Sequence, residues 1–354
     1  MFGVRQLRYC VDFLAALMRC QTSPLVLAAA MAFCAAPAAG QTPIKFSLDG
    51  PIEGPEALFL FPQDKGYFRS EGLEVTIDEA LSPLDPITRV ASGAYELGFA
   101  DFHGLIRYRD QHPTTPIKAI FVVYNKPPYA VVARKSRGIT DPKQLENKKI
   151  GAQASGSTLA VWPLFAKLND IDPSKVTIEN TALAVRVPML AAGQLDGALG
   201  ASFRLYVDLK DRGVPIDDIV LMPMADYRMK LYGNVIIVNS KFASEKPDDV
   251  KNFLEAFTRS LKEIIRRPAD AVDSILRRDG AAKKDVELER LRMAIRDNIV
   301  TPEVRANGLG GIEIARMEKS IEQIALVYAF KNKPKAEDAF DASFLPIPAE
   351  RRVN

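Results

Sequence analysis

Cysteine, histidine and long apolar runs are scarce in this chain, and each shortage removes a class of function. Its three cysteines stand at positions 10, 20 and 34, so beyond residue 40 no disulfide, zinc cage or cysteine nucleophile is available. The two histidines, His103 and His112, do not have a metal-site spacing. P-loop, zinc-protease and serine-hydrolase motifs are also missing. The sequence therefore predicts no cofactor and no bound metal.

The first 40 residues have the pattern of a secretory signal peptide. Three arginines give a basic start, the apolar run 24–36 follows, and small residues fill 36–40. The apolar run is shorter than the ~20 residues of a membrane span, and no later apolar run approaches that length either. We therefore expect a cleaved leader over residues 1–40 and a periplasmic mature protein. A lipid anchor on Cys34 is the alternative, and the bulky Phe33 before it opposes that reading.

The charge balance gives no reason to expect nucleic acid or a membrane surface as the main partner. The formal net charge is +3, and the leader carries more basic than acidic residues. The basic cluster over 135–149 is interleaved with Asp141 and Glu146, which is typical of a solvated face. The sequence thus predicts a small-molecule partner and no nucleic acid.

Strand and helix patterns alternate along the rest of the chain. Alternating segments at 44–49 and 73–77 flank a helical pattern over 56–65, and the apolar run 117–124 is typical of a strand covered on both faces. The series restarts after residue 128, and beyond residue 239 most segments have helical spacing. This order predicts an α/β fold with mainly parallel sheets flanked by helices.

The stretch 148–162 combines a strand, a polar turn and the start of a helix. The periodic run 159–168 predicts a helix whose first turn holds Ser157 and Thr158. Free N–H groups at a helix start, together with the helix dipole, attract an anionic or strongly polar group. Ser155, Gly156 and the two residues after them are therefore candidate ligand contacts. The alternative is that Ser155 or Ser157 only caps the helix.

Six short motifs occur in one order along the chain. They are Leu48-Asp49, 64–68 with 71–75, 91–93 with 98–101, 116–119, 141–145 with 148–151, and 192–196. Together they resemble the solute-binding proteins of ABC importers for nitrate, sulfonates and taurine, and their relatives that bind thiamine-pyrimidine precursors. The resemblance implies a monomer that captures a solute and delivers it to an ABC permease with its ATPase subunit.

The resemblance also implies a two-lobed fold of the periplasmic-binding-protein type II. Residues 43–127 plus 239–345 would form lobe I, residues 128–238 would form the inserted lobe II, and residues 346–354 would form a C-terminal tail. Ligand would sit between the lobes, at strand ends and helix starts. The candidates that match by position are Asp49, Asp101, Ser155, Gly156, Ser157, Thr158, Trp162, Ser202, Arg204, Tyr232 and Asn234.

Several of these candidates have a purely structural alternative. Asp101 is also placed to cap the next helix, Arg204 to form an ordinary ion pair, and Trp162 to pack in the core. Family members often carry a tryptophan after the Leu-Asp pair, where this chain has Gly50. A ligand-stacking ring expected from the family is therefore missing at that position.

Two ligand classes and two further roles stay open. A sulfonate or other small organic anion fits the hydroxyls of the helix start and Arg204, and this is our expectation. A pyrimidine or aromatic carboxylate fits Trp162, Tyr129 and Tyr232. Enzymes of the family that make the thiamine pyrimidine use a cysteine-rich iron-binding motif, which has no counterpart beyond residue 40, so the sequence predicts no enzyme. A ligand-sensing module is the other role.

Overall fold

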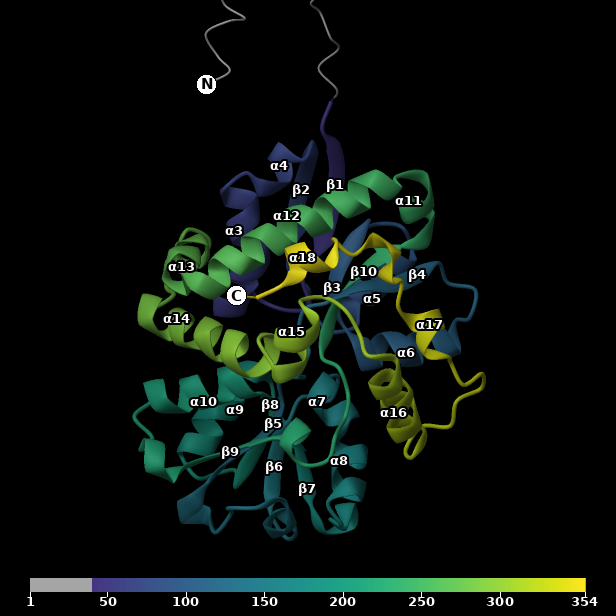
Figure 1. Ribbon diagram of the computed structural model, residues 1–354. Coiled ribbons are helices and arrows are strands. Elements are labelled where there is room, and N and C mark those ends of the chain that lie inside the picture. The colour runs from purple at the N-terminus through teal and green to yellow at the C-terminus, as the bar shows by residue number, and fades with distance from the viewer. Residues whose placement is uncertain (1–39, 354) are drawn as a thin grey trace, which may run out of the picture. The chain divides into compact units, whose positions relative to one another are not determined.

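Two five-stranded sheets form the frame of the protein (Figure 1). The computed structural model describes residues 40–353, so the predicted signal peptide lies outside the described residues. The first sheet contains β1 (Thr42–Ser47), β2 (Leu73–Asp78), β3 (Leu97–Asp101), β4 (Ile117–Val122) and β10 (Asn234–Asn239). The second contains β5 (Tyr129–Arg134), β6 (Lys149–Ala152), β7 (Thr177–Asn180), β8 (Gly197–Ala201) and β9 (Ile219–Pro223).

Each sheet is mainly parallel and has one reversed strand. The orders are β2-β1-β3-β10-β4 and β7-β6-β8-β5-β9. β10 is antiparallel to both of its neighbours, and so is β5. Both reversed strands follow a segment in which the chain crosses from one sheet to the other. The predicted two-lobed α/β class is confirmed, while the chain boundaries of the lobes stay a prediction. We call the first sheet with its helices lobe I and the second with its helices lobe II.

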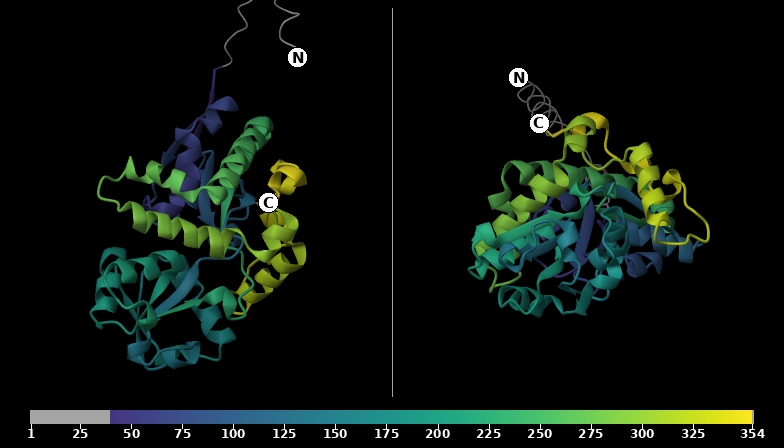
Figure 2. Two further views of the ribbon diagram at one scale, coloured as in Figure 1. Left: turned by 60° about the vertical axis from the view of Figure 1, so that its left-hand side comes forward. Right: turned by 90° about the horizontal axis from the view of Figure 1, so that it is seen from below.

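Helices cover both faces of each sheet (Figures 1 and 2). The helices of lobe II are α7 (Ser157–Ala160), α8 (Trp162–Leu168), α9 (Leu183–Ala191) and α10 (Ser202–Asp211). Those of lobe I are η1 (Gly54–Glu56), α3 (Ala57–Asp64), α4 (Tyr67–Ser70), α5 (Asp85–Ala91), α6 (Phe102–Gln111), α11 (Ser240–Glu245), α12 (Pro247–Arg266), α13 (Pro268–Leu276), α14 (Lys284–Met293), α15 (Pro302–Asn307), α16 (Ile314–Ala325), α17 (Ala336–Ala339) and α18 (Pro348–Arg351). Within residues 40–353 no helix has both the length and the apolar character needed to cross a bilayer.

Alternation along β10 explains why both faces of the first sheet are buried. Ile236 and Val238 join the core under α3 and α12, whereas Val235 and Ile237 join the core under α5 and α6. On the α12 side the phenylalanine rings stack, with centroids 5.2 Å apart for Phe59 and Phe257. Such pairs add to the free energy gained from burial alone. The packing fixes the first sheet, and with it the loop after β1 that enters the candidate site.

The helix predicted over 159–168 is broken in the structure. α7 ends at Ala160, Val161 separates the two helices, and α8 begins at Trp162. Pro163 explains the break, because its nitrogen carries no hydrogen to donate to the carbonyl of Leu159. The predicted helix start is therefore a helix of four residues, whose dipole is weak.

A polar network holds the two chain crossings together. The Glu303 carboxylate accepts hydrogen bonds from Asn125 (2.9 Å), Tyr232 (2.8 Å) and Arg316 (2.7 Å). The Arg316 guanidinium also lies 4.0 Å from the centroid of the Tyr232 ring. Asn125 follows β4 and Tyr232 precedes β10, so both crossings are tied to α15 and α16.

Four ion pairs join lobe II to lobe I on the side of α10. Lys210 contacts Glu289 at 2.7 Å, Lys283 contacts Asp211 at 2.9 Å, and Arg290 pairs with Asp208. The fourth pair joins Arg204 to Glu53 at 2.7 Å. These contacts hold α10 against α14 and against the loop before η1.

Gly310 allows a tight approach next to β4, and this gives a first prediction. Its φ of +85° suits glycine, and an added Cβ would strike the buried ring of Phe121. We expect Gly310→Ala to lower the free energy of unfolding by at least ~2 kcal/mol, from the left-handed backbone plus overpacking. Gly213→Ala is the control, because its φ is +79° with open space around it, and it should cost about 1 kcal/mol. Equal losses for the two variants in urea unfolding would contradict the packing argument.

Candidate functional site

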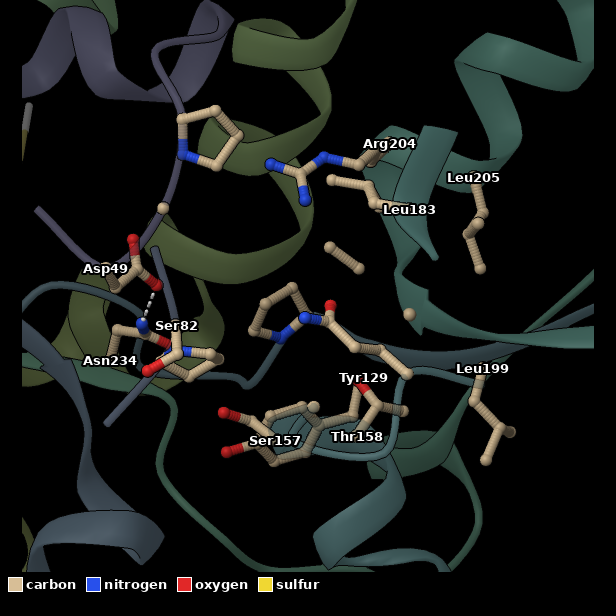
Figure 3. Close-up of a pocket in the computed structure, with 18 of the residues that line it drawn as sticks. Asp49, Ser82, Tyr129, Ser157, Thr158, Leu183, Leu199, Arg204, Leu205 and Asn234 are labelled. Atoms are coloured by element: carbon tan, nitrogen blue, oxygen red, sulfur yellow. Dashed lines mark hydrogen bonds between the residues drawn. The ribbon is translucent and has the colours of Figure 1, made fainter. Parts of the chain in front are cut away.

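A cavity of about 260 Å³ lies between the two lobes (Figure 3). Lobe I contributes Asp49 and Asn234 on one side, and lobe II contributes Leu183 and Arg204 across from them. The volume is near the lower end of the ~300–1,000 Å³ typical of ligand pockets. The cavity is therefore suited to a small solute rather than to a dinucleotide.

Two carboxyl groups form the lobe I wall. Asp49 follows β1 and accepts a hydrogen bond of 2.6 Å from the Nδ2 of Asn234. Burial raises the pKa of Asp49 to about 6. Burial, with the nearby charges of Asp49 and Glu53, raises the pKa of Glu56 well above its ordinary value. Groups of this kind accept hydrogen bonds when ionised and donate one when protonated.

Arg204 is both a cavity residue and an inter-lobe contact. Its Nε donates to the Oε2 of Glu53 at 2.7 Å, and both side chains are largely buried. The negative charges of Glu53 and Glu56 outweigh burial and raise the pKa of Arg204. Arg204 therefore forms an ion pair, which was the structural alternative for this residue. The pair joins the two lobes and does not lie on an open surface.

Four aromatic side chains line the cavity: Phe99, Tyr124, Tyr129 and Phe203. The Tyr124 ring meets Phe99 edge-on at 5.3 Å and Phe203 at 6.3 Å between centroids. These rings supply flat apolar surface in the cavity, which Gly50 also lines. The cavity can thus hold a planar ring.

The turn before α7 and the first residues of α7 reach the cavity, and no side chain caps the helix. Gly156, Ser157 and Thr158 line the cavity, and Gly156 is the N-cap residue of α7. No side chain makes a capping hydrogen bond there, so neither Ser155 nor Ser157 has the alternative role. Because α7 has four residues, the hydroxyls rather than a helix dipole are what this turn offers a ligand.

Five of the candidates lie away from this cavity, Asp101 among them. Trp162 is buried beside Phe165, with ring centroids 5.9 Å apart, because it begins α8 on the core side. Tyr232 belongs to the crossing network described above. Ser202 is buried at the start of α10, where its backbone N–H donates to the carbonyl of Pro128 at 2.8 Å. Ser155 lines a neighbouring cavity.

Asp101 has the capping role that the sequence left as an alternative. Its Oδ1 accepts from the N–H of Gly104 at 2.5 Å at the start of α6, and its Oδ2 accepts from the hydroxyl of Tyr129. The residue borders the second cavity, of about 290 Å³, together with His103 and Arg107. In residues 40–353 no group of three or more histidine, cysteine, aspartate or glutamate side chains is arranged to hold a metal ion.

Several cavity residues were missed from the sequence, among them Glu56, Tyr124 and Arg186. Glu56 is the last residue of η1 and directly precedes α3, in the segment that follows β1 and Asp49. Arg186 is the one charged residue of α9, and a lone arginine in an apolar helix is a signal that sequence analysis could have used. Tyr124 ends an apolar run and had no distinguishing signal.

The two five-stranded sheets with a cavity between their lobes define a fold class, the two-lobed periplasmic-binding-protein fold. The NMT1/THI5 like family model matches residues 57–271, so the chain belongs to the NMT1/THI5-like family. Among solved structures, the periplasmic aliphatic sulphonate binding protein SsuA from Escherichia coli superposes with a TM-score of 0.66 at 10% identity, covering 85% of this chain and 92% of that one. A likeness at this identity shows the fold alone.

Two relatives by sequence have different names. A 4-amino-5-hydroxymethyl-2-methylpyrimidine phosphate synthase of Schizosaccharomyces pombe is 25% identical over 215 residues, which are 58% of this chain and 61% of that protein. The chain thus spans about three fifths of the length of this synthase. A formylaminopyrimidine-binding protein of Halalkalibacterium halodurans is 22% identical over 286 residues, which are 79% of this chain and 83% of that protein.

The prediction that the chain is not an enzyme is contradicted by these comparisons. Similar synthases are matched in Aspergillus parasiticus and Saccharomyces cerevisiae, at 27% and 26% identity. The prediction rested on the missing cysteine-rich motif, the predicted secretory leader and the absence of general catalytic motifs. Absence of that motif removes one way of binding iron, and it does not decide what other side chains do.

The burial of Asp101 leads to a prediction on stability. Burial raises its pKa to about 7 from the ordinary 3.8, against the opposing bond from Gly104. The folded state therefore binds this proton more tightly than the unfolded state, so the contribution to stability falls as pH rises from about 4 to about 7.

Asp101→Asn keeps a capping side chain and removes the titration. We expect the unfolding free energy of the variant to rise relative to the parent across that window, by ~1 kcal/mol or more. The measurement is urea unfolding of both proteins at pH 4.5, 6 and 8. A difference between them that does not change with pH would contradict the assignment.

Proposed function

We propose that this chain binds a small aminopyrimidine between its two lobes, as the extracytoplasmic solute-binding component of an ABC importer. The observation that carries the proposal is the pair of carboxyl groups, Asp49 and Glu56, in the wall of a small aromatic cavity. An aminopyrimidine presents an exocyclic amino donor beside a ring nitrogen acceptor. A carboxyl group that both accepts and donates matches that edge, and the aromatic side chains match the ring faces.

A small anion without donor groups fits this wall less well. Its charge would face Asp49 and Glu56, and the four-residue α7 offers little dipole to attract it. The charges at the cavity therefore favour the pyrimidine class, which the sequence had left open, over the sulfonate class that it favoured. The name of the Halalkalibacterium halodurans relative points the same way.

The importer role follows from what the lobes can do. Ligand bridges lobe I and lobe II, and the ion pairs between α10 and α14 then keep the lobes together. A permease with its ATPase subunit would read the closed form of a monomer in the periplasm. These partners and this compartment are part of the proposal.

Asp49→Asn tests the lobe I wall. The substitution keeps the size of the side chain and loses a charge-assisted hydrogen bond to the ligand, worth about 1.5–3 kcal/mol. We expect the Kd for 4-amino-5-hydroxymethyl-2-methylpyrimidine, measured by isothermal titration calorimetry, to rise by roughly tenfold or more.

Asp110→Asn is the control, because the Asp110 carboxylate does not line the cavity and accepts its hydrogen bonds from Tyr328, Lys331 and Asn332. Its Kd should stay within about twofold of the parent value. No binding to the parent protein, or equal losses in both variants, would contradict the proposal.

The names of the synthase relatives favour a second candidate, formation of an aminopyrimidine phosphate in the same cavity. Incubation of the protein with a metabolite extract, followed by mass spectrometry for 4-amino-5-hydroxymethyl-2-methylpyrimidine phosphate, tests it. A synthase would raise the amount of this compound above that in a heat-denatured control. An unchanged amount would remove this candidate and leave the binding proposal in place.

A further inference from the structure

Arg186 brings a buried positive charge to the lobe II side of the cavity. The residue belongs to α9, lines the cavity and is only 3% exposed. Its Nε donates to the Thr181 hydroxyl at 3.2 Å, and its two terminal nitrogens donate to the carbonyls of Leu199 and Thr181, both at 2.9 Å. All three acceptors are uncharged.

The neighbouring arginines are paired differently. Arg204 has Glu53 at 2.7 Å, and Arg290 has Glu287 at 2.6 Å. Burial, together with the like charge of Arg204, lowers the pKa of Arg186 to about 10. The guanidinium thus stays protonated at neutral pH without a carboxylate partner.

A buried charge without a counter-ion is costly, by several kcal/mol in typical proteins. Arg186 connects Thr181 with Leu199 of β8 by donating to both carbonyls. This connection does not require a charge, because a neutral amide could donate to the same two carbonyls. A guanidinium carries five N–H donors, and three are used here, so two are left for a partner in the cavity. These facts indicate that the partner of Arg186 is supplied from outside the protein.

We propose that Arg186 anchors an oxyanion on the ligand, so that the cavity takes a bipolar solute, an aminopyrimidine that carries a phosphate or sulfonate group. This inference rests on the proposed function for the ring and adds the anionic substituent. The amino edge faces Asp49 and Glu56, and the oxyanion faces Arg186, with the hydroxyls of Ser157 and Thr158 on the same lobe. Planar guanidinium groups bind such oxygens through two parallel hydrogen bonds.

The first experiment uses oxyanions without a ring. Methyl phosphate and methanesulfonate are titrated by calorimetry into the full chain, into Arg186→Gln and into Arg186→Lys. We expect Arg186→Gln to weaken the binding of the preferred anion by at least tenfold, and Arg186→Lys to lose less because it keeps the charge. The anion with the lower Kd in the parent identifies the substituent.

Arg134→Gln is the matched control. Arg134 donates to the carbonyl of Ala191 and pairs with Asp218, away from the cavity, so its loss should lower stability and leave anion binding within about twofold. If Arg186→Gln unfolds, the anion affinity of Arg186→Lys compared with that of the parent still tests the anchor. Anion binding to the parent that is absent, or that is unchanged in both Arg186 variants, would overturn the anchor.

The second experiment compares 4-amino-5-hydroxymethyl-2-methylpyrimidine with its phosphate ester. We expect the parent to prefer the ester by roughly a hundredfold and Arg186→Gln to prefer it by less than about fivefold. Equal affinity for both compounds in the parent would overturn the bipolar ligand while the pyrimidine proposal stands. If neither pyrimidine compound binds while the binding of methyl phosphate still depends on Arg186, the pyrimidine proposal is overturned and the role of Arg186 as the anion anchor stands.

Discussion

The ion pair between Arg204 and Glu53 is the interaction on which the candidate site most depends. It joins α10 of lobe II to the loop before η1 of lobe I, and it stands at the wall of the cavity. The charge of Arg204 also reaches both sides of the site: it opposes the larger effect of burial on the pKa of Asp49, and it adds to the effect of burial that lowers the pKa of Arg186. The contact that joins the two lobes therefore also influences the ionisable groups that a ligand would meet in the cavity.

The remaining inter-lobe pairs extend this contact along α10. Lys210 with Glu289 and Asp211 with Lys283 are partly exposed, so each contributes little by itself. These ion pairs matter for alignment, because they fix the position of α10 along α14. The Glu303 network fixes the two chain crossings separately, so two sets of polar contacts connect the lobes.

Much of the fold could be predicted from the sequence, because hydrophobic periodicity reports which faces are buried. The helical spacing expected beyond residue 239 is present in α12, and the apolar run 117–124 contains β4, covered on both faces. The break at Val161 was missed because periodicity continued through it. Pro163 gave the correct signal, since proline is favoured in the first turn of a new helix.

The site was only partly predictable, because position along the chain does not report side-chain direction. Asp49, Asn234 and Arg204 do line the cavity, whereas Trp162 and Tyr232 point into the core and the crossing network. Whether a residue faces a ligand depends on the tilt of one lobe against the other, which no local pattern encodes. The charges that favour an aminopyrimidine come from Glu56 and Asp49 together, and their proximity is a tertiary property.

The most direct test of the central claim is a crystal structure of the chain grown with 4-amino-5-hydroxymethyl-2-methylpyrimidine phosphate. We expect the ring between the lobes, with its amino edge within hydrogen-bond distance of Asp49 or Glu56 and its phosphate on Arg186. Density for the compound in the second cavity, beside Asp101 and His103, or an empty cavity at saturating ligand, would contradict it.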